Sequence, residues 1–177
     1  ARQGKTSMIL AVSKKVVGVI TAADKVRPYA KETVERLKNI GLEVGMITGD
    51  SRHTARAIAS QLGIQTVLSE VLPGDKANEV EKLQAKGLVV GMVGDGINDA
   101  PALAQADLGI AVGSGTDVAM EASDIILMTS DLRAVANAIE LSKKTMTKVK
   151  QNLFWAFFYN CLGIPIAAGV LYPMFGI

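Results

Sequence analysis

Two carboxylates and an amide lie close together in the segment VGDGINDAPAL. Asp95 and Asp99 flank Gly96-Ile97-Asn98, and a glycine-permitted turn there brings their side chains to one place. Mg²⁺ in proteins prefers one or two carboxylates together with water and phosphate oxygens. The same spacing is compatible with a structural role, in which Asp95 begins a turn and Asp99 caps the next helix. The segment is therefore a candidate Mg²⁺ site.

A hydroxyl and an ammonium precede these acids in the chain. Thr48 supplies the hydroxyl, and Gly49 lets backbone N–H groups approach an anion closely in the segment Thr48-Gly49-Asp50. Lys76, which follows Pro73-Gly74-Asp75, could neutralise a phosphoryl oxygen. Each feature alone also fits an ordinary turn or a solvated surface charge. Together they predict a phosphoryl-transfer site, because such sites work by positioning and electrostatics. A convincing nucleophile does not accompany them.

An alternation of strands and helices positions these residues. A hairpin is expected at residues 8–20. Helices are expected at residues 28–39, 52–62, 75–86, 99–105 and 116–121, strands at 42–48, 66–68, 88–93, 108–112 and 124–128, and a long helix from about Asp131. This order predicts an α/β fold, with a parallel sheet covered by helices on both faces. Ligands of such folds bind beyond the carboxyl ends of the strands, where Thr48, Asp95 and Asp24 are expected.

Composition excludes several classes of function. Lys and Arg total 19 and Asp and Glu 17, so the net charge is +2, and no nucleic acid is expected as a partner. Cys161 is the single cysteine and His53 the single histidine. The chain therefore cannot form an internal disulfide, a zinc site built from several cysteines or a multi-histidine metal centre.

The carboxyl-terminal residues have the composition of a membrane segment. Residues 151–177 carry no charged side chain, and the apolar stretch 153–177 is longer than the ~20 residues that a transmembrane helix needs. A lysine cluster at 143–150 precedes it, which marks the cytoplasmic side. We expect the preceding part to be cytoplasmic. Gly163 and Pro165 are more typical of a helix in a bundle than of a lone anchor.

Three motifs in the order TGD, LPGDK and GDGINDAPAL resemble the haloacid-dehalogenase-like phosphorylation domain of P-type ATPases. The resemblance implies that Thr48 binds the phosphoryl group and that Gly49 and Asp50 complete its loop. It implies that Lys76 balances an aspartyl phosphate. It further implies that Asp95 binds Mg²⁺, with Asn98 and Asp99 in support.

The resemblance also implies a domain organisation. Asp24 in AADKVRP is similar to the acid of the family's hinge. Residues 1–22 would be the last strands of a nucleotide-binding domain, residues 23–147 a phosphorylation domain, and residues 148–177 a transmembrane helix with the start of the next loop. The family's Asp-Lys-Thr-Gly-Thr, which carries the phosphorylated aspartate, does not occur in these residues. We therefore expect a fragment that is inactive alone, as the absence of an initiator Met and of a charged end also indicates.

The last segment, NLFWAFFYNCLGIPIAAGVLYP, resembles the penultimate helix of copper-transporting heavy-metal (type IB) ATPases. That resemblance implies a Cu⁺ site with Tyr159 and Asn160, although Asn160 could instead bond between helices while Tyr159 packs. Cys161 is a soft ligand type but is expected to lie outside the site. Copper is favoured over zinc because zinc pumps lack the Tyr-Asn pair, and silver remains an alternative to copper.

The expected function is that of part of an ATP-driven Cu⁺ export pump that uses Mg²⁺ and an aspartyl-phosphate intermediate. Its expected partners are the nucleotide-binding and actuator domains and other transmembrane helices of the same pump, the lipid bilayer and a copper chaperone. Three alternatives stay open. They are a zinc- or cadmium-type pump, a self-contained membrane-anchored phosphatase with Asp24 or another acid as nucleophile, and a regulatory module that binds phosphate or nucleotide.

Overall fold

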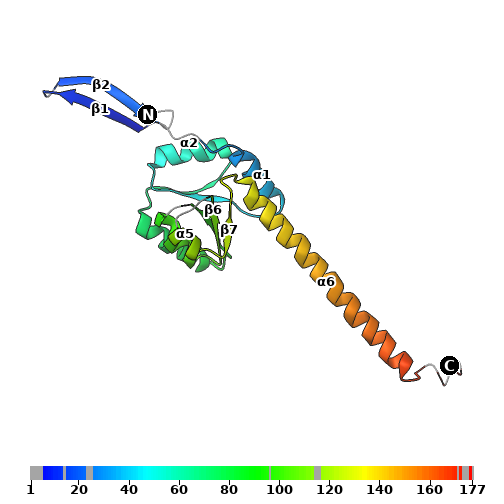
Figure 1. Cartoon of the computed structure of the whole chain (residues 1–177). Helices are drawn as coiled ribbons and strands as arrows, with labels where there is room; N and C mark the ends of the chain where they lie inside the picture. Colours follow the sequence, from blue (N-terminus) through cyan, green and yellow to red (C-terminus); the bar gives the residue numbers. More distant parts are fainter. Residues whose placement is uncertain are drawn as a thin grey trace. The chain divides into compact units, whose positions relative to one another are not determined.

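The structure of the 177-residue chain is a computed structural model. It describes residues 6–13, 15–22, 26–95, 97–113, 117–170, 172 and 176. The chain divides into two compact units, Ala1–Ala136 and Asn137–Ile177, with the elements labelled in Figure 1. Asp24 lies outside the described residues, so its predicted place at a hinge is not tested.

The first two strands form the predicted hairpin. Strand β1 (Thr6–Val12) pairs antiparallel with β2 (Lys15–Ala22), and the register shifts between Leu10 and Ala11. Successive side chains of a strand point to opposite faces, yet the neighbours Ile9 and Leu10 are both exposed. Neither face of β1 is therefore covered at this point by the described residues.

Five parallel strands follow, in two separate sheets. One sheet pairs β3 (Gly45–Ile47) with β4 (Thr66–Leu68). The other has the order β5 (Gly91–Gly94), β6 (Leu108–Val112) and β7 (Ile125–Leu127). The predicted parallel pairing is confirmed, but the single sheet is corrected to two, because no strand ladder joins β3 to β5 within the described residues.

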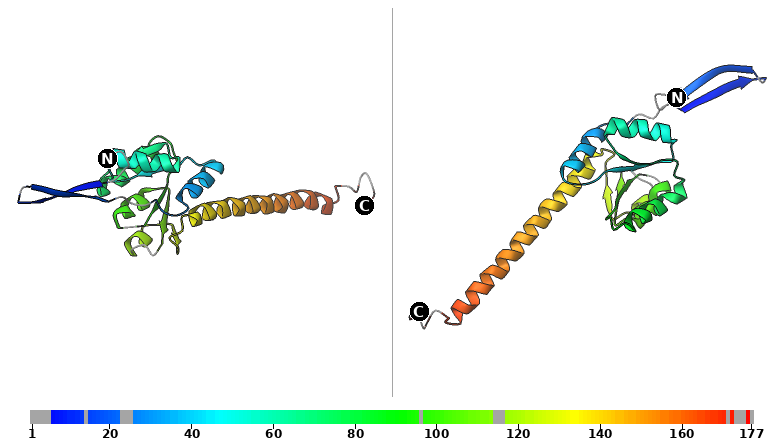
Figure 2. Two further views of the ribbon diagram at one scale, coloured as in Figure 1. Left: turned by 90° about the horizontal axis from the view of Figure 1, so that it is seen from above. Right: turned by 180° about the vertical axis from the view of Figure 1, so that it is seen from behind.

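Helices cover the strands on two sides. Helices α1 (Ala30–Asn39) and α2 (Arg52–Leu62) lie on one side. The other side carries α3 (Lys76–Gln84), α4 (Ala100–Gln105) and α5 (Asp117–Glu121) (Figures 1 and 2). Short 3₁₀ helices at Pro73–Asp75 and Ile97–Asp99 precede α3 and α4. This arrangement confirms the predicted α/β fold with helices on both faces.

One hydrophobic core serves both sheets. Val80 of α3, Met92 of β5, and Ala102 and Leu103 of α4 form a buried cluster, and Ile47 of β3 packs against it. The two sheets therefore share apolar contacts although they do not share strand hydrogen bonds. This packing keeps the ends of β3 and β5 in one folded unit.

Two helices begin later than predicted, and the conformation of the preceding backbone explains each difference. Helix α1 begins at Ala30 instead of residue 28, because Tyr29 adopts a left-handed conformation with φ 62°. Helix α3 begins at Lys76, because the preceding Pro73–Asp75 forms a 3₁₀ turn. Strand β3 is also shorter than the predicted 42–48. The order of the elements is unchanged.

Helix α6 runs without interruption over Arg133–Ala167, which confirms the predicted long helix through the lysine cluster. Within the described residues, none of the helices combines the length and the apolar character that crossing a membrane requires. Helix α6 ends at Ala167, before a turn in which Gly169 has φ 82°, so the first part of the apolar stretch belongs to it.

Candidate active site

The segment after β3 is held by hydrogen bonds within itself and to the residues that follow β4. The Thr48 hydroxyl donates to the Asp50 carboxylate at 2.9 Å and accepts from the Asp50 backbone N–H at 3.1 Å. The backbone N–H groups of Glu70 and Val71 donate to the carbonyls of Asp50 and Thr48 at 2.9 and 3.1 Å. A Cβ built on Gly49 would lie 3.4 Å from the Val71 carbonyl oxygen. The predicted Thr48-Gly49-Asp50 group is thus a closed turn with an exposed carboxylate.

The segment after β5 brings two carboxylates and an amide together. Asp95 directly follows the strand, and Asn98 and Asp99 lie in the 3₁₀ helix before α4. Asp95 and Asn98 are exposed, whereas Asp99 is partly buried. A Cβ built on Gly94 would lie 2.7 Å from the Asp99 Cβ and 3.0 Å from its Oδ2. Gly94 therefore leaves the space that the Asp99 carboxylate occupies.

Lys76 and Asp99 form a partly buried ion pair. The Lys76 Nζ lies 2.6 Å from the Asp99 Oδ1, and both side chains are 16% exposed. The 3₁₀ turn at Pro73–Asp75 ends at Lys76, so it delivers this side chain to the segment after β5. The structure therefore places Lys76 within the site and not among the solvated surface charges.

A second cationic side chain, Arg27, pairs with the Asp95 carboxylate. The sequence analysis did not identify Arg27 as a site residue. The Arg27 guanidinium donates to the Asp95 Oδ2 across 68 positions of the chain, and each of these side chains is about half exposed. Arg27 lies in AADKVRP, a segment in which only the acid was singled out. Arg27 follows the predicted hinge acid, Asp24, by three residues, and this closeness in the sequence could have pointed to it. Asp95 and Asp99 are thus each paired with one cationic side chain.

The donor set fits Mg²⁺. Among the described residues, no group of three or more His, Cys, Asp or Glu side chains could hold a metal ion. Mg²⁺ does not need such a cage, because it binds through one or two carboxylates and completes its shell with water and phosphate oxygens. Asp95 already holds a cation, the Arg27 guanidinium. Asp95 and Asp99, with the Asn98 amide beside them, have the chemistry that Mg²⁺ prefers.

The predicted site residues thus fall into two groups in the first unit. Each group follows the carboxyl end of a parallel strand, as predicted. In the described part of the chain, however, no hydrogen bond or ion pair connects Thr48 or Asp50 with Asp95, Asn98 or Asp99. The two groups hold their own positions independently.

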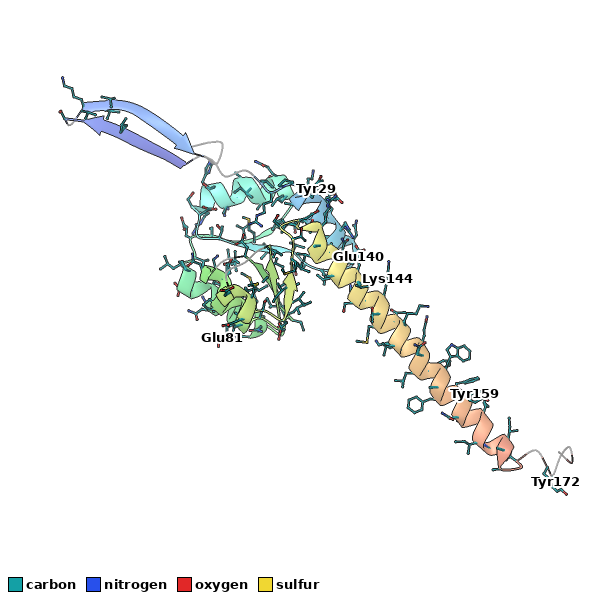
Figure 3. The ribbon with its side chains drawn as sticks, in the orientation of Figure 1. Tyr29, Glu81, Glu140, Lys144, Tyr159 and Tyr172 are labelled. Atoms are coloured by element: carbon teal, nitrogen blue, oxygen red, sulfur yellow. The ribbon has the colours of Figure 1, made fainter. Side chains whose placement is uncertain are left out.

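The predicted Cu⁺ ligands lie on α6, in the second unit. Tyr159, labelled in Figure 3, is 77% exposed. The Asn160 side chain donates to the Ala156 carbonyl of its own helix at 2.9 Å. Cys161 is a free, exposed thiol. The polar atoms of this pair are therefore accessible, and Asn160 does not bond to another helix among the described residues.

Comparison with known proteins places this site in a family. The family model for haloacid dehalogenase-like hydrolases matches residues 2–107. The chain belongs to the haloacid dehalogenase-like hydrolase family. This membership agrees with the parallel sheets and with acids at the ends of β3 and β5.

Relatives within this family are metal-transporting ATPases. The chain is 57% identical over 176 residues to the probable copper-exporting P-type ATPase of Archaeoglobus fulgidus, covering 99% of this chain and 22% of that protein. It is 55% identical over 176 residues to the probable copper-transporting ATPase PacS of Synechocystis, covering 99% of this chain and 24% of that protein. The predicted resemblance to copper-transporting P-type ATPases is confirmed. The chain spans about a quarter of these relatives' length.

Solved structures confirm the fold. The crystal structure of a zinc-transporting PIB-type ATPase in the E2.Pi state matches 95% of this chain and 28% of its own, with a TM-score of 0.83 and 36% identity. The catalytic CPx-ATPase domain CopB-B matches 74% of this chain and 53% of its own, with a TM-score of 0.62 and 35% identity.

Proposed function

We propose that this chain is part of an ATP-driven Cu⁺ export pump that works through an aspartyl-phosphate intermediate. The observation that carries the proposal is the identity of 55–57% to copper ATPases along 99% of the chain. The identity to the zinc-transporting ATPase is 36%, which favours copper over zinc or cadmium. The chemistry of Asp95, Asp99 and Lys76 supports the phosphoryl-transfer part.

Asp95 and Asp99, with Asn98 in support, would hold Mg²⁺ in this pump. When bound, Mg²⁺ supplies positive charge that neutralises phosphoryl oxygens. Thr48 offers its hydroxyl to the phosphoryl group, and Gly49 and Asp50 shape the loop around it. Lys76, which pairs with Asp99, adds a second positive charge. The site thus needs ATP as its substrate and Mg²⁺ as its cofactor.

The phosphorylated aspartate would come from a strand outside these residues. Within the described part of the chain, β3 and β5 each have a ladder partner on one edge only. A strand between them would pair with both open edges, and its carboxyl end would lie between Thr48 and Asp95. We propose that an upstream segment of the full-length pump supplies this strand. The chain alone is then inactive.

The remaining parts of the chain fit the other domains of the pump. We assign residues 1–22 to the end of the nucleotide-binding domain, residues 23–147 to the phosphorylation domain and residues 148–177 to the membrane part. The exposed apolar side chains of β1, such as Ile9 and Leu10, would be covered by the rest of the nucleotide-binding domain. The other partners are the actuator domain, other membrane helices, the lipid bilayer and a copper chaperone.

Tyr159 and Asn160 are the proposed Cu⁺ ligands, and the same set would accept Ag⁺. Their exposed polar atoms lie within an apolar segment, where polar side chains commonly mark ion pathways. The full-length pump would be a multi-pass membrane protein. The lysine cluster at residues 143–150 places the catalytic part on the cytoplasmic side.

Phosphate incorporation tests the proposal. The full-length pump, incubated with labelled ATP and Mg²⁺, should take up an acid-stable, hydroxylamine-labile label only when Cu⁺ is present. The 177-residue chain should take up none. The full-length variants Tyr159→Phe and Asn160→Ala should take up no label when Cu⁺ is added. The matched control Tyr172→Phe should still take up label with Cu⁺.

Each other outcome points to one alternative. Label on the chain itself would place the nucleophile within it and favour the self-contained phosphatase. Zn²⁺-dependent label would favour the zinc- or cadmium-type pump. Nucleotide or phosphate binding without any label, on either protein, would favour the regulatory module.

A further inference from the structure

A short segment contacts both the acidic site and the start of α6. Arg27, Pro28 and Tyr29 directly precede α1, and the side chains of Arg27 and Tyr29 make contacts far along the sequence. Arg27 pairs with Asp95, and the Tyr29 ring lies under the Arg133 guanidinium, whose Cζ is 3.7 Å from the ring centroid. Arg133 is the first residue of α6 and belongs to the same unit as Arg27 and Tyr29.

We propose that Arg27, Pro28 and Tyr29 form a link that couples cation occupancy at Asp95 to the first turn of α6. In this scheme Arg27 holds the Asp95 carboxylate while Mg²⁺ is absent and leaves it when Mg²⁺ binds. The link rests on the proposed function, because that function supplies the Mg²⁺ ion. Arg27 and Tyr29 are positioning residues in it, since neither acts on the phosphoryl group.

Charge explains why Arg27 and Mg²⁺ exclude one another. Arg27 contacts one oxygen of the Asp95 carboxylate, so a metal ion on the other oxygen would lie beside the guanidinium. Two cations on one carboxylate repel each other. The Arg27 pair is about half exposed, and exposed ion pairs are weak, so little free energy opposes the displacement of the guanidinium by a divalent ion. Binding of Mg²⁺ therefore frees Arg27.

The backbone between the two contacts is short and constrained. Pro28 fixes its own φ, and the Ala30 N–H donates to the Arg27 carbonyl at 3.2 Å in a tight turn. Tyr29 is held at φ 62°, a left-handed conformation that few residues other than glycine adopt. This turn ties the backbone of Arg27 closely to that of Tyr29, so a change in the backbone at one residue is felt at the other.

The far end of the link is rigid. The Arg133 guanidinium donates to both oxygens of Asp131 at distances of 2.7 to 3.1 Å, and the Arg133 N–H donates to Asp131 at 2.9 Å. These bonds lower the pKa of the Asp131 carboxyl, so the pair stays ionised at neutral pH. The planar guanidinium is thus fixed over the Tyr29 ring, where cation–π attraction acts. Movement of Tyr29 changes the environment of Arg133.

Side-chain NMR of the 177-residue chain with Mg²⁺ alone tests the link. In wild type, the Nε–Hε signals of Arg27 and Arg133 should shift with the same midpoint as the Asp95 amide, while that of Arg52 should stay. Arg27→Gln should bind Mg²⁺ about two- to fivefold more tightly, and its Arg133 signal should no longer respond. Arg52→Gln, which removes an equal charge from another exposed ion pair, should leave the affinity unchanged.

Variants of Tyr29 separate the link from a structural role. Tyr29→Leu should bind Mg²⁺ as wild type does but lose the Arg133 response, and Tyr29→Phe should restore the response because it keeps the ring. The link would be overturned if Mg²⁺ did not shift the Arg133 Nε–Hε signal in wild type. It would also be overturned if that signal shifted fully in Arg27→Gln. Equal affinity changes in Arg27→Gln and Arg52→Gln would overturn it as well. If Asp95→Asn binds Mg²⁺ as wild type does, the proposed Mg²⁺ site fails as well.

Discussion

The segments after β3 and β5 reach similar positions by different means. Thr48 and Asp50 bond to each other over two residues, and their carbonyls accept backbone hydrogen bonds from Glu70 and Val71. Asp95 and Asp99 instead bond to the cationic side chains of Arg27 and Lys76, which lie 68 and 23 positions away. The first segment is therefore held by hydrogen bonds of its own side chains and of the backbone, whereas the second is held by ion pairs with distant side chains. Removal of a single side chain should therefore disturb the second segment more than the first.

The largest difference should appear when one acid is removed from each segment. Asp99→Ala leaves the Lys76 ammonium partly buried without its partner, which should cost about 2–3 kcal/mol of unfolding free energy. Asp50→Ala removes exposed hydrogen bonds and should cost about 0.5–1 kcal/mol. Urea unfolding followed by circular dichroism measures both. Lys76→Met added to Asp99→Ala should recover part of the loss, and equal losses in the two single variants would remove the contrast.

Adding one methyl group to each segment should give a smaller difference. Gly94→Ala places a Cβ 2.7 Å from the Asp99 Cβ, so Asp99 must move away from Lys76 at a cost of about 1–3 kcal/mol. Gly49→Ala places its Cβ 3.4 Å from the Val71 carbonyl oxygen and should stay within about 0.5 kcal/mol of wild type. The same unfolding experiment compares them. A Gly49→Ala variant as unstable as Gly94→Ala would contradict the contrast.

The smallest expected effect on stability concerns the hydrogen bond of Val90, the residue before β5. The Val90 N–H donates to the Asp107 carboxylate at 2.8 Å, and this bond, with one from Gln84, lowers the Asp107 pKa. Its stabilisation is therefore present above the unfolded pKa of ~3.9 and is lost as the pH falls through the lower folded value. For β3, no side-chain carboxylate bonds to Gly45–Ile47 among the described residues.

Thermal unfolding at several pH values checks this effect. Wild type should have a higher Tm than Asp107→Asn near neutral pH, and the difference should shrink in acid once both side chains are uncharged. A difference that is independent of pH would exclude the carboxylate as its source.

The sequence predicted the order of the elements and the polar groups that follow the strands. These features depend on local patterns, such as apolar runs followed by glycine and acid. The pairing of Arg27 with Asp95 and the split between β3 and β5 could not be predicted. Both depend on which distant segments meet, which hydrophobic periodicity does not contain. The left-handed Tyr29 was missed because Pro28 is itself a favoured first residue of a helix.

The division between β3 and β5 also bears on how the protein folds. The β3–β4 pair and the β5–β6–β7 sheet each join strands that are near in sequence, so each forms quickly. With the proposed upstream strand between them, closure of the full sheet has to wait for a contact across the whole nucleotide-binding domain. Such long-range contacts are slow, because loop-closure entropy is lost before any contact compensates for it. Completion of the active site would then be the late, rate-limiting event of folding.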